Sequence, residues 1–415
     1  MQLYDTADIK EKVILVAVSE DDHDDTEVSL AELKALVETV GAEVVGTLTQ
    51  KREKRHPGTY LGTGKLDELY DLILDTDATG VVCDDELSPA QLSNMEDRLQ
   101  TKIMDRTLII LDIFAMRAST REGKIQVELA QLRYRATRLT GLGRSLSRLG
   151  GGIGTRGPGE KKLEIDRRVI HNRISVLKAE LEDVVRHRQI ARENRRKSRI
   201  PVVAIVGYTN SGKSTLLNHL TDAGVFEQDQ LFATLDPTTR NYKLKNGQEI
   251  LLTDTVGFIR KLPHHLIKAF RSTLEEAVYS DIILHVADIS NPDIEGQMHT
   301  VYDTLTELGI KDKYIITAFN KIDRCSDKPV IKDLRADKTV YISAKTGENV
   351  QELLSMIEEA VMDRFILIER IFAYKDAGDI AMIRKFGNLL EEDYRAEGIY
   401  VKAYVPKDIY ASLAF

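Results

Sequence analysis

Residues 201–220 read PVVAIVGYTNSGKSTLLNHL, and they decide the fold of the region around them. The apolar run at 201–206 predicts a buried strand, and residues 215–220 predict a helix. The stretch between them matches GxxxxGKS, in which backbone N–H groups converge on a β-phosphate, a lysine reaches the β- and γ-phosphates and a hydroxyl binds Mg²⁺. Strand, loop and helix in this order predict an α/β domain that binds a nucleoside triphosphate.

Two later segments specify the nucleotide. Residues 250–257 read ILLTDTVG, a strand-like run that ends in DxxG, where Asp254 can hold the water shell of Mg²⁺ and the Gly257 amide can meet the γ-phosphate. Residues 320–323 read NKID after another apolar run, and the carboxylate of Asp323 can accept hydrogen bonds from N1–H and the 2-amino group of guanine. Adenine lacks this pair of donors and would leave the carboxylate unpaired. The predicted ligand is therefore GTP or GDP.

The segment 231–240 (LFATLDPTTR) lies where the first switch of a GTPase belongs, between the phosphate loop and DxxG. Thr234 is expected to supply the second hydroxyl to Mg²⁺, and Thr238 and Thr239 are the alternatives. A surface turn in which the threonine is incidental is the competing interpretation.

The residue after DxxG is Phe258, where many GTPases carry a glutamine that orients the attacking water. An aromatic ring cannot do this. Either hydrolysis is slow, or a partner, a backbone group or a monovalent cation orders the water. Asn210 is similar to the asparagine that binds K⁺ in several potassium-dependent GTPases, although an asparagine that only stabilises the loop would look the same.

These motifs predict the site residues. Lys213, Thr234 and Gly257 are expected to act in catalysis, and Ser214 and Thr234 to bind Mg²⁺, with Asp254 acting through its water shell. The residues expected to contact the nucleotide are Gly207, Tyr208, Thr209, Asn210, Ser211, Gly212, Lys213, Ser214, Thr215, Phe232, Ala233, Thr234, Leu235, Asp236, Asp254, Thr255, Val256, Gly257, Asn320, Lys321, Ile322, Asp323, Ser343, Ala344 and Lys345.

At 415 residues the chain is too long for one hydrophobic core, and its alternating elements predict an α/β protein of four domains. Strands are expected at 13–18, 43–48, 80–84 and 107–114 and helices at 29–40, 65–75 and 88–99. The end of the chain is expected to form a strand (365–374), a helix (379–394) and a strand (399–404). The expected domains are a small α/β domain (1–112), a basic helical hairpin (113–199), a GTPase domain (200–364) and a small α/β domain (365–415).

Two heptad-like series of apolar residues predict the hairpin. Ile125, Leu129, Leu132, Ala136 and Leu139 are spaced by four and three residues, and a matching series runs from Leu163 to Val184. Residues 133–200 hold 19 Lys and Arg against 7 Asp and Glu, so the remainder of a chain of net charge −8 carries −20. The Gly-rich stretch 141–159 between the helices contains Arg144, Arg148 and Arg156, which are expected to meet RNA phosphates; a flexible connector is the alternative.

Composition excludes several classes of protein. No stretch approaches the roughly 18 apolar residues of a membrane span, and residues 1–5 (MQLYD) show no secretory signal, so a cytoplasmic monomer is expected. Cys83 and Cys325 lie far apart and outside any metal-ligand pattern, which argues against disulfides and a zinc site.

The sequence resembles HflX-type GTPases over nearly its whole length. That resemblance implies a cytoplasmic GTPase that binds the large ribosomal subunit and its ribosomal RNA, with no DNA partner, splits stalled ribosomes under stress, and inserts its Gly-rich tip toward the peptidyl-transferase region. The segments that carry it are YLGTGK (60–65), DELSPAQ (85–91), MDRT (104–107), LDIFA (111–115), QVELA (126–130), GGGIGTRGPGE (150–160) and FATLD (232–236).

Three functions compete at this point: a ribosome-associated GTP switch, in splitting or in biogenesis; an RNA-remodelling ATPase whose motor is the amino-terminal domain, as reported for some members of that family; and a signalling GTPase with a membrane or protein partner. Asn320 and Asp323 argue against ATP at the main site, and the residues 62–65 (GTGK) lack the full phosphate-loop spacing. The basic arm has a Gly-rich tip and no amphipathic aromatic face, which argues against a membrane.

Overall fold

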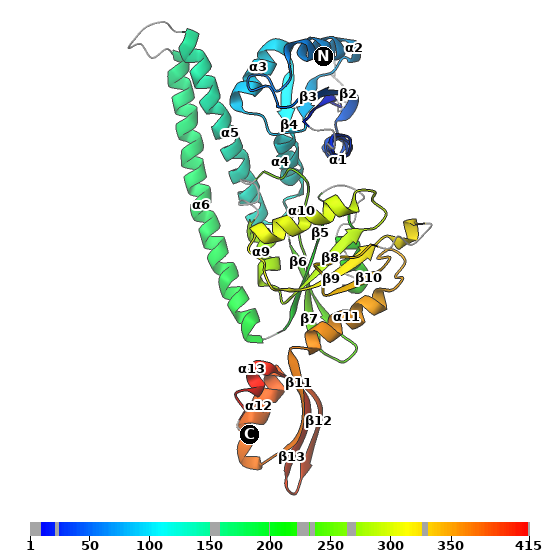
Figure 1. Ribbon diagram of the computed structural model, residues 1–415. Coiled ribbons are helices and arrows are strands. Elements are labelled where there is room, and N and C mark those ends of the chain that lie inside the picture. Colours follow the sequence, from blue (N-terminus) through cyan, green and yellow to red (C-terminus); the bar gives the residue numbers. More distant parts are fainter. Residues whose placement is uncertain are drawn as a thin grey trace, which may run out of the picture. The chain divides into compact units, whose positions relative to one another are not determined.

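The computed structural model describes residues 10–20, 25–149, 158–198, 200–221, 232, 237–263, 271–325 and 331–413 (Figure 1). The described residues form three sheets and fall into two compact units. The first unit holds those within Met1–Val185, Gln228–Asp236 and Ile259–Ser272, and the second those within Arg186–Glu227, Pro237–Phe258 and Thr273–Phe415. The α/β fold class is confirmed, whereas the division into four domains stays a prediction.

The amino-terminal sheet is entirely parallel, with the strand order β2-β1-β3-β4. Helices α2 and α3 pack over one face, where Ile14 and Val16 meet Leu66, Leu69 and Met95 in a single buried cluster. The strands are β1 (Lys12–Ser19), β2 (Glu43–Lys51), β3 (Gly80–Cys83) and β4 (Lys102–Asp105), and the helices are α1 (Thr26–Thr39), α2 (Thr63–Thr76), α3 (Pro89–Leu99) and α4 (Arg106–Arg117).

The strand expected at 107–114 is wrong, because these residues belong to helix α4. The run TLIILDIF is apolar except for Thr107 and Asp112, and a short apolar run fits a buried helix as well as a buried strand. Asp105, the residue before the helix, favours the helical conformation. Its side chain accepts a hydrogen bond from Leu108 N at 3.0 Å and caps the first turn.

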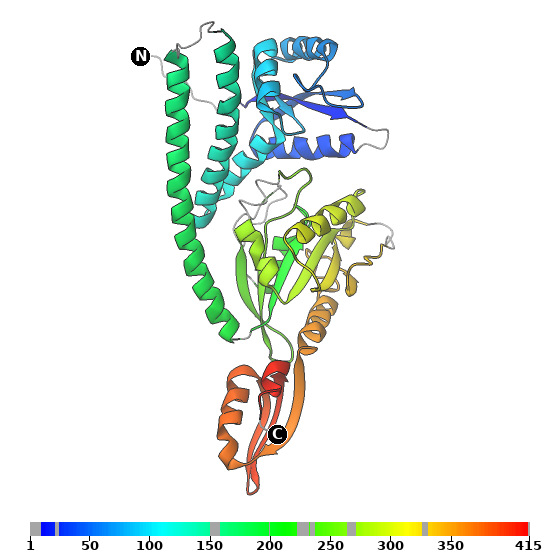
Figure 2. The ribbon, with the colours of Figure 1, turned by 60° about the vertical axis from the view of Figure 1, so that its left-hand side comes forward.

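Two long helices form the predicted antiparallel hairpin, α5 (Arg121–Leu149) and α6 (Pro158–Ser198), which run side by side in Figures 1 and 2. Ile125 and Leu129 of α5 bury their side chains against Ile174 and Leu177 of α6. Ion pairs cross the seam in the order an antiparallel pair requires: Glu128 with Arg173, at 2.7 Å, and Arg121 with Glu180, at 4.0 Å.

The Gly-rich tip is shorter than expected from the sequence. Helix α5 continues through residues 141–149, so the assignment of this stretch to a loop is wrong. Leu142, Leu146 and Leu149 have helical spacing, and an isolated glycine in a helix costs only about 1 kcal/mol relative to alanine. The helix ends at Leu149, just before three consecutive glycines.

The central sheet carries the phosphate-loop strand in its middle, with the order β10-β9-β8-β5-β7-β6 and only β6 antiparallel to its neighbour among the described strands. Its buried cluster joins the strands to helices α7 and α11. The elements are β5 (Val202–Gly207), α7 (Lys213–Thr221), β6 (Thr238–Lys243), β7 (Glu249–Asp254), α9 (Arg271–Tyr279), β8 (Ile282–Asp288), α10 (Ile294–Glu307), β9 (Tyr314–Asn320), η1 (Ile322–Arg324), β10 (Lys338–Tyr341) and α11 (Val350–Met362).

The last segment of the chain is a three-stranded antiparallel sheet of order β11-β13-β12. The helix expected at 379–394 is correct only to Phe386, and the rest is strand β12. Gly387 ends the helix where a Cβ would lie 2.8 Å from the Tyr404 carbonyl oxygen. The elements are β11 (Phe365–Phe372), η2 (Tyr374–Asp376), α12 (Ala377–Phe386), β12 (Asn388–Arg395), β13 (Gly398–Pro406) and α13 (Lys407–Tyr410).

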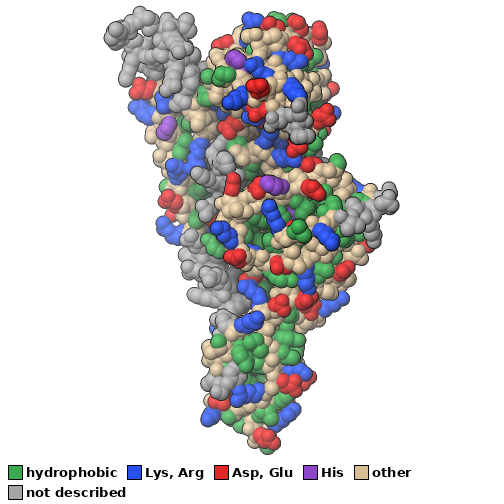
Figure 3. Space-filling view, viewed as in Figure 1, with side chains coloured by type: hydrophobic (Ala, Val, Ile, Leu, Met, Phe, Trp, Pro, Cys, Tyr) green, Lys and Arg blue, Asp and Glu red, His purple; other side chains and the backbone are tan. Residues whose placement is uncertain are grey.

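Hydrophobic side chains also lie on the outside of this last segment, where Figure 3 shows them gathered. Leu367, Tyr374, Leu390 and Tyr394 are exposed there. Elsewhere on the face in Figure 3, acidic and basic side chains are interspersed. Among the helices that the structure describes, none combines the length and the apolar character that crossing a membrane requires.

Candidate functional site

The phosphate loop connects the end of β5 to the start of α7, and its conformation explains its glycines. Gly212 has φ +95°, and a Cβ on it would lie 2.2 Å from Asn320 Nδ2. A Cβ on Gly207 would lie 2.2 Å from the carbonyl oxygen of Val286 on the neighbouring strand β8. Asn210, at the turn, has φ +59°, which asparagine tolerates better than most residues. Side chains at the two glycines would therefore push the loop out of place.

Lys213 points back into the loop that precedes it. Its Nζ donates a hydrogen bond to the Tyr208 carbonyl oxygen at 2.7 Å, and the side chain is buried. Burial lowers the pKa of Lys213 to about 8, and the nearby Asp254 carboxylate opposes that shift. The loop thus holds a buried amine at the position that a phosphate-binding lysine needs.

Ser214 of the phosphate loop and Asp254 of DxxG, both expected near Mg²⁺, contact each other directly. Ser214 Oγ donates to Asp254 Oδ2 at 2.8 Å, and Asp254 is buried at the end of β7. Strand β7 lies next to β5, so the DxxG aspartate ends beside the start of α7. A hydroxyl and a carboxylate are the hard oxygen donors that suit Mg²⁺.

The DxxG segment is paired with the phosphate loop through its backbone. Phe258 N donates to the Gly207 carbonyl oxygen at 3.0 Å, and Thr209 N donates to the Phe258 carbonyl oxygen at 2.8 Å. A Cβ on Gly257 would lie 2.9 Å from Thr209 Cα and 3.0 Å from Lys213 Nζ, so only glycine fits. The ring of Phe258 is buried. The sequence showed that no glutamine follows DxxG, but it gave no sign of this backbone pairing.

The NKxD motif, which is expected to recognise guanine, joins three loops. Asn320 Nδ2 donates to the Ser211 carbonyl oxygen at 2.8 Å, and Asn320 Oδ1 accepts from Ala344 N at 2.8 Å. Asp323 Oδ1 accepts from Ser343 Oγ at 2.6 Å. The NKxD and Ser-Ala-Lys segments are thereby placed together beside the phosphate loop.

Lys321 adds a contact that the motif alone did not reveal. It has φ +68°, donates to the Asn210 carbonyl oxygen at 2.7 Å, and pairs with Asp288 Oδ2 at 2.7 Å. Asp288 ends β8, between the phosphate-loop strand and the NKxD strand. The position of Asp288, a carboxylate at the end of the buried strand β8, was the signal in the sequence that could have pointed to this ion pair with Lys321.

The first switch is only partly described. Phe232 is buried with φ +56°, and its ring packs edge-on against Phe114 of α4 at 4.7 Å between centroids. Residues 233–236, which include Thr234, lie outside the described residues. The alternative hydroxyls are in β6, where Thr238 is in register with Asp254 and Thr239 Oγ1 lies 3.0 Å from Thr253 Oγ1.

The expected RNA contacts are at the hairpin end. Arg144 and Arg148 lie in helix α5, where the structure describes the backbone, and Arg156 lies outside the described residues. Their proposed contacts therefore remain a prediction. The hairpin itself is fastened to the amino-terminal sheet, because Tyr134 and Arg138 of α5 both contact the Asp105 carboxylate, Tyr134 Oη at 2.7 Å.

Three family models match the chain: GTP-binding GTPase N-terminal over residues 27–115, GTP-binding GTPase Middle Region over 117–195, and 50S ribosome-binding GTPase over 202–321. GTPase HflX of Lacrimispora saccharolytica is 63% identical over 413 residues, covering 100% of this chain and 98% of that protein. GTPase HflX of Escherichia coli strain K12 is 42% identical over 360 residues, covering 86% and 84%. A solved structure of a GTP-binding protein from Sulfolobus solfataricus in complex with GDP is 25% identical, has a TM-score of 0.44, and covers 85% of this chain and 99% of that chain.

Proposed function

The chain belongs to the HflX family of GTP-hydrolysing enzymes, and from this we propose that it is a guanine-nucleotide switch that binds the large ribosomal subunit and splits ribosomes. The observation that supports this most strongly is the match of residues 202–321 to a family described as 50S ribosome-binding GTPases. Rescue of stalled ribosomes under stress, or a step of ribosome biogenesis in the cytoplasm, is the process that such a switch would serve.

In the proposed reaction, the phosphate loop holds the triphosphate and Lys213 neutralises the charge that develops on it. The buried amine acts where water is excluded, and this makes its field on the β- and γ-phosphates strong. The Gly257 amide approaches the γ-phosphate, because the glycine already lies against Thr209 and Lys213. When bound, Mg²⁺ would neutralise charge on the phosphate oxygens; Ser214 would hold it directly, and Asp254 would hold it through its water shell.

Base selection in this proposal is divided between two residues. Asn320 forms hydrogen bonds with both ends of its side-chain amide, to Ser211 and to Ala344. It therefore holds together the loops that would surround the base. Asp323, fixed by the Ser343 hydroxyl, presents the carboxylate that pairs with guanine. The segment Ser343–Lys345 lies beside them, since the Ala344 amide donates to Asn320, and a main-chain N–H of this segment would support the base.

The residue that follows the DxxG segment is not suited to orient the attacking water, because Phe258 is apolar and buried. We therefore expect the water to be ordered by the ribosome or by a monovalent cation near Asn210. Such a dependence suits a switch that should hydrolyse GTP only after it has docked. The arm would provide the docking contact, with Arg144, Arg148 and Arg156 meeting phosphates of ribosomal RNA.

Co-sedimentation with purified large subunits tests the proposal. The full chain should pellet with the subunits in a non-hydrolysable GTP analogue and much less in GDP, and it should convert intact ribosomes into subunits on a sucrose gradient. Lys213→Ala, which removes the phosphate contact, is the matched control and should do neither. Binding that ignores the nucleotide, or hydrolysis of ATP stimulated by free RNA, would contradict the switch and favour an RNA-remodelling motor.

A further inference from the structure

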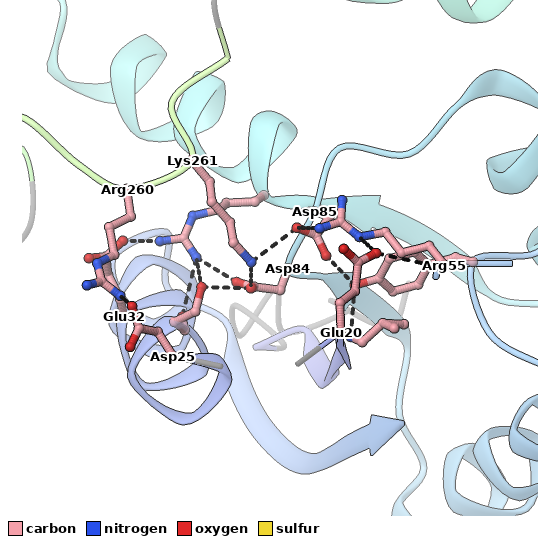
Figure 4. Close-up of polar contacts among 12 residues, drawn as sticks. Glu20, Asp25, Glu32, Arg55, Asp84, Asp85, Arg260 and Lys261 are labelled. Atoms are coloured by element: carbon pink, nitrogen blue, oxygen red, sulfur yellow. Dashed lines mark hydrogen bonds and ion pairs between the residues drawn. The ribbon is translucent and has the colours of Figure 1, made fainter. Parts of the chain in front are cut away.

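A cluster of acidic side chains, which we call the acidic crevice, lies at the carboxyl edge of the amino-terminal sheet, the edge where ligands bind in open parallel sheets. The chain leaves β1 for its neighbour β2 on one side, whereas β3 on the other side of β1 leads to β4, so the strand order reverses between β1 and β3. Asp84 and Asp85 follow β3 directly at this point, and only 0% and 5% of their surfaces are exposed. Figure 4 shows the side chains that surround them.

Each carboxylate is held in place by neighbours of its own. Asp84 Oδ1 accepts from Arg106 Nη1 at 2.6 Å, and its Oδ2 accepts from Ser29 Oγ at 2.7 Å. Asp85 Oδ2 accepts from Tyr60 Oη at 2.7 Å, and its Oδ1 lies 3.2 Å from Arg55 Nη2. These contacts make the crevice a preformed structure.

The crevice has more negative than positive groups of its own. Arg106 also pairs with Glu32, and Arg55 with Glu20, while Asp25 lies at the rim. The described residues of the amino-terminal region thus bring five carboxylates and two guanidinium groups to this place. Asp84 and Asp85 are the buried members, and because a buried carboxylate is stable only with a positive partner, the crevice favours a cation and repels phosphate.

The cation is supplied by the segment that follows DxxG. Lys261 Nζ lies 3.1 Å from Asp85 Oδ1 and also donates to Asp84 Oδ2, and Arg260 Nη1 lies 3.0 Å from Asp25 Oδ2 (Figure 4). Lys261 has φ +53°, and Ile259 before it is buried. These residues belong to the same compact unit as the amino-terminal sheet, although Lys261 is only the fourth residue after Gly257.

We propose that this crevice is a docking site for the segment 259–261, and that the docked segment presets Gly257 for the γ-phosphate of GTP. Residues 257 and 258 are paired with the phosphate loop, and residues 260 and 261 are anchored at the crevice, so one short segment connects the two places. A segment held at both ends loses less freedom when the Gly257 amide binds phosphate. By linkage, GTP then strengthens docking as much as docking strengthens GTP binding.

A contact of the first switch points in the same direction. Phe232, from the segment expected to close over Mg²⁺, packs edge-on against Phe114 of α4 within the same compact unit. The amino-terminal domain therefore contacts described residues of both nucleotide-sensing segments, one through an aromatic pair and the other through an ion pair.

The test uses nucleotide affinities of the full chain. Lys261→Met should weaken binding of a non-hydrolysable GTP analogue about fivefold or more relative to wild type. GDP affinity should stay within twofold, because GDP has no γ-phosphate to engage Gly257. Asp85→Asn should give the same selective loss, and the double variant should lose little more than either single one. Lys261→Arg keeps the charge and should restore most of the affinity, and Lys375→Met, an exposed lysine of η2, should change nothing.

Three outcomes would overturn the proposal: an unchanged affinity for the GTP analogue in Lys261→Met, an equal loss for GDP, or losses that add up in the double variant. A thermal melt of each variant checks that it is folded. If Lys261→Met does not fold, Lys261→Gln replaces it in the comparison of the single and double variants. Failure here leaves GTP hydrolysis and ribosome binding untouched, because neither Lys261 nor Asp85 belongs to the nucleotide site.

Discussion

Asn320 and Asp323 belong to one motif, but the folded chain uses them differently. Asn320 is hydrogen-bonded at both ends of its amide, to Ser211 and to Ala344, and so holds two loops together. Asp323 is fixed on one oxygen by Ser343 Oγ. A change at Asn320 should disturb the whole site, whereas a change at Asp323 should alter the choice of base alone.

At the base we predict that Asp323→Asn shifts preference from guanine toward xanthine nucleotides. An amide presents a donor where the O2 of xanthine replaces the guanine amino group, and each lost or mismatched hydrogen bond to a charged group costs about 1.5–3 kcal/mol. Competition binding of GDP against its xanthine counterpart measures the shift. Glu348→Gln, an exposed residue on the loop that carries Ser343, should leave preference unchanged. An Asp323→Asn protein that still prefers guanine would remove Asp323 from the base site.

Lys213 makes the affinity for GTP depend on pH. Burial lowers its pKa to about 8, and only the protonated amine attracts phosphate. The affinity of the free protein for GTP should therefore fall as the pH rises through about 8, by less than tenfold per pH unit. Titration with a fluorescent GTP analogue between pH 7 and 8.5 measures this fall. Lys213→Ala should bind weakly at each pH and lose hydrolysis, and a flat profile in the wild type would contradict the prediction.

At the scale of elements, the helical hairpin depends on a narrow apolar seam. Leu177 is 1% exposed between α5 and α6, whereas its neighbour Val176 is 51% exposed on the outer face. In the part of the hairpin whose side chains the structure describes, four buried residues and a few half-buried ones line the seam between the two helices. Because this core is small, a cavity in it should cost the hairpin a large part of its stability.

We predict that Leu177→Ala lowers the free energy of unfolding by about 2–5 kcal/mol, because it removes buried methyl groups and leaves a cavity. Denaturant unfolding followed by far-UV circular dichroism measures the loss. Val176→Ala is the matched control and should change stability by no more than about 0.5 kcal/mol. Equal effects of the two changes would show that the seam contributes no stability.

The arm should bind RNA through charge. Changing Arg144, Arg148 and Arg156 to Ala should flatten the slope of log affinity for ribosomes against log salt by up to about 3, since each phosphate contact releases roughly one counterion. Nucleotide affinity should not change. Replacing Arg167, Arg168 and Lys178, three exposed residues of α6, removes the same charge elsewhere. If the triple change at the tip and the triple change in α6 alter the salt slope equally, the tip makes no specific RNA contact and is only a connector.

For the whole molecule, the central question is what completes the catalytic site. Phe258 is buried, and the segment beside it is paired by its backbone to the phosphate loop. The chain therefore lacks the usual side-chain guide for the water at this position. Completion from outside would make hydrolysis conditional on a partner, as a ribosome-bound switch requires.

We predict that ribosomes raise the rate of GTP hydrolysis severalfold or more. A phosphate-release assay with and without large subunits measures the increase, and Lys213→Ala serves as the inactive control. Replacing Na⁺ by K⁺ in the same assay tests Asn210 separately, because only a bound cation would distinguish the two salts. A high rate that ribosomes do not change would show that the chain orders the water by itself.

The local parts of this protein could be predicted from the sequence. The phosphate loop, DxxG and NKxD each consist of neighbouring residues whose chemistry is legible from their order. Most strands and helices followed from periodicity, as in the Ile125 to Leu139 series. Predictions failed where local signals are ambiguous: the apolar run 107–114 is a helix, residues 141–149 are helical in spite of their glycines, and residues after Gly387 form a strand.

The sequence by itself determined the class of the protein and predicted its nucleotide and the residues expected to bind it. Only the tertiary structure decided which distant side chains meet. The order of the central sheet brings Asp288 to Lys321, and the reversal of strand order between β1 and β3 creates the crevice for Lys261, which is 177 residues from Asp84. Periodicity and motif spacing report only on near neighbours, whereas contacts between distant residues depend on how strands are ordered in a sheet.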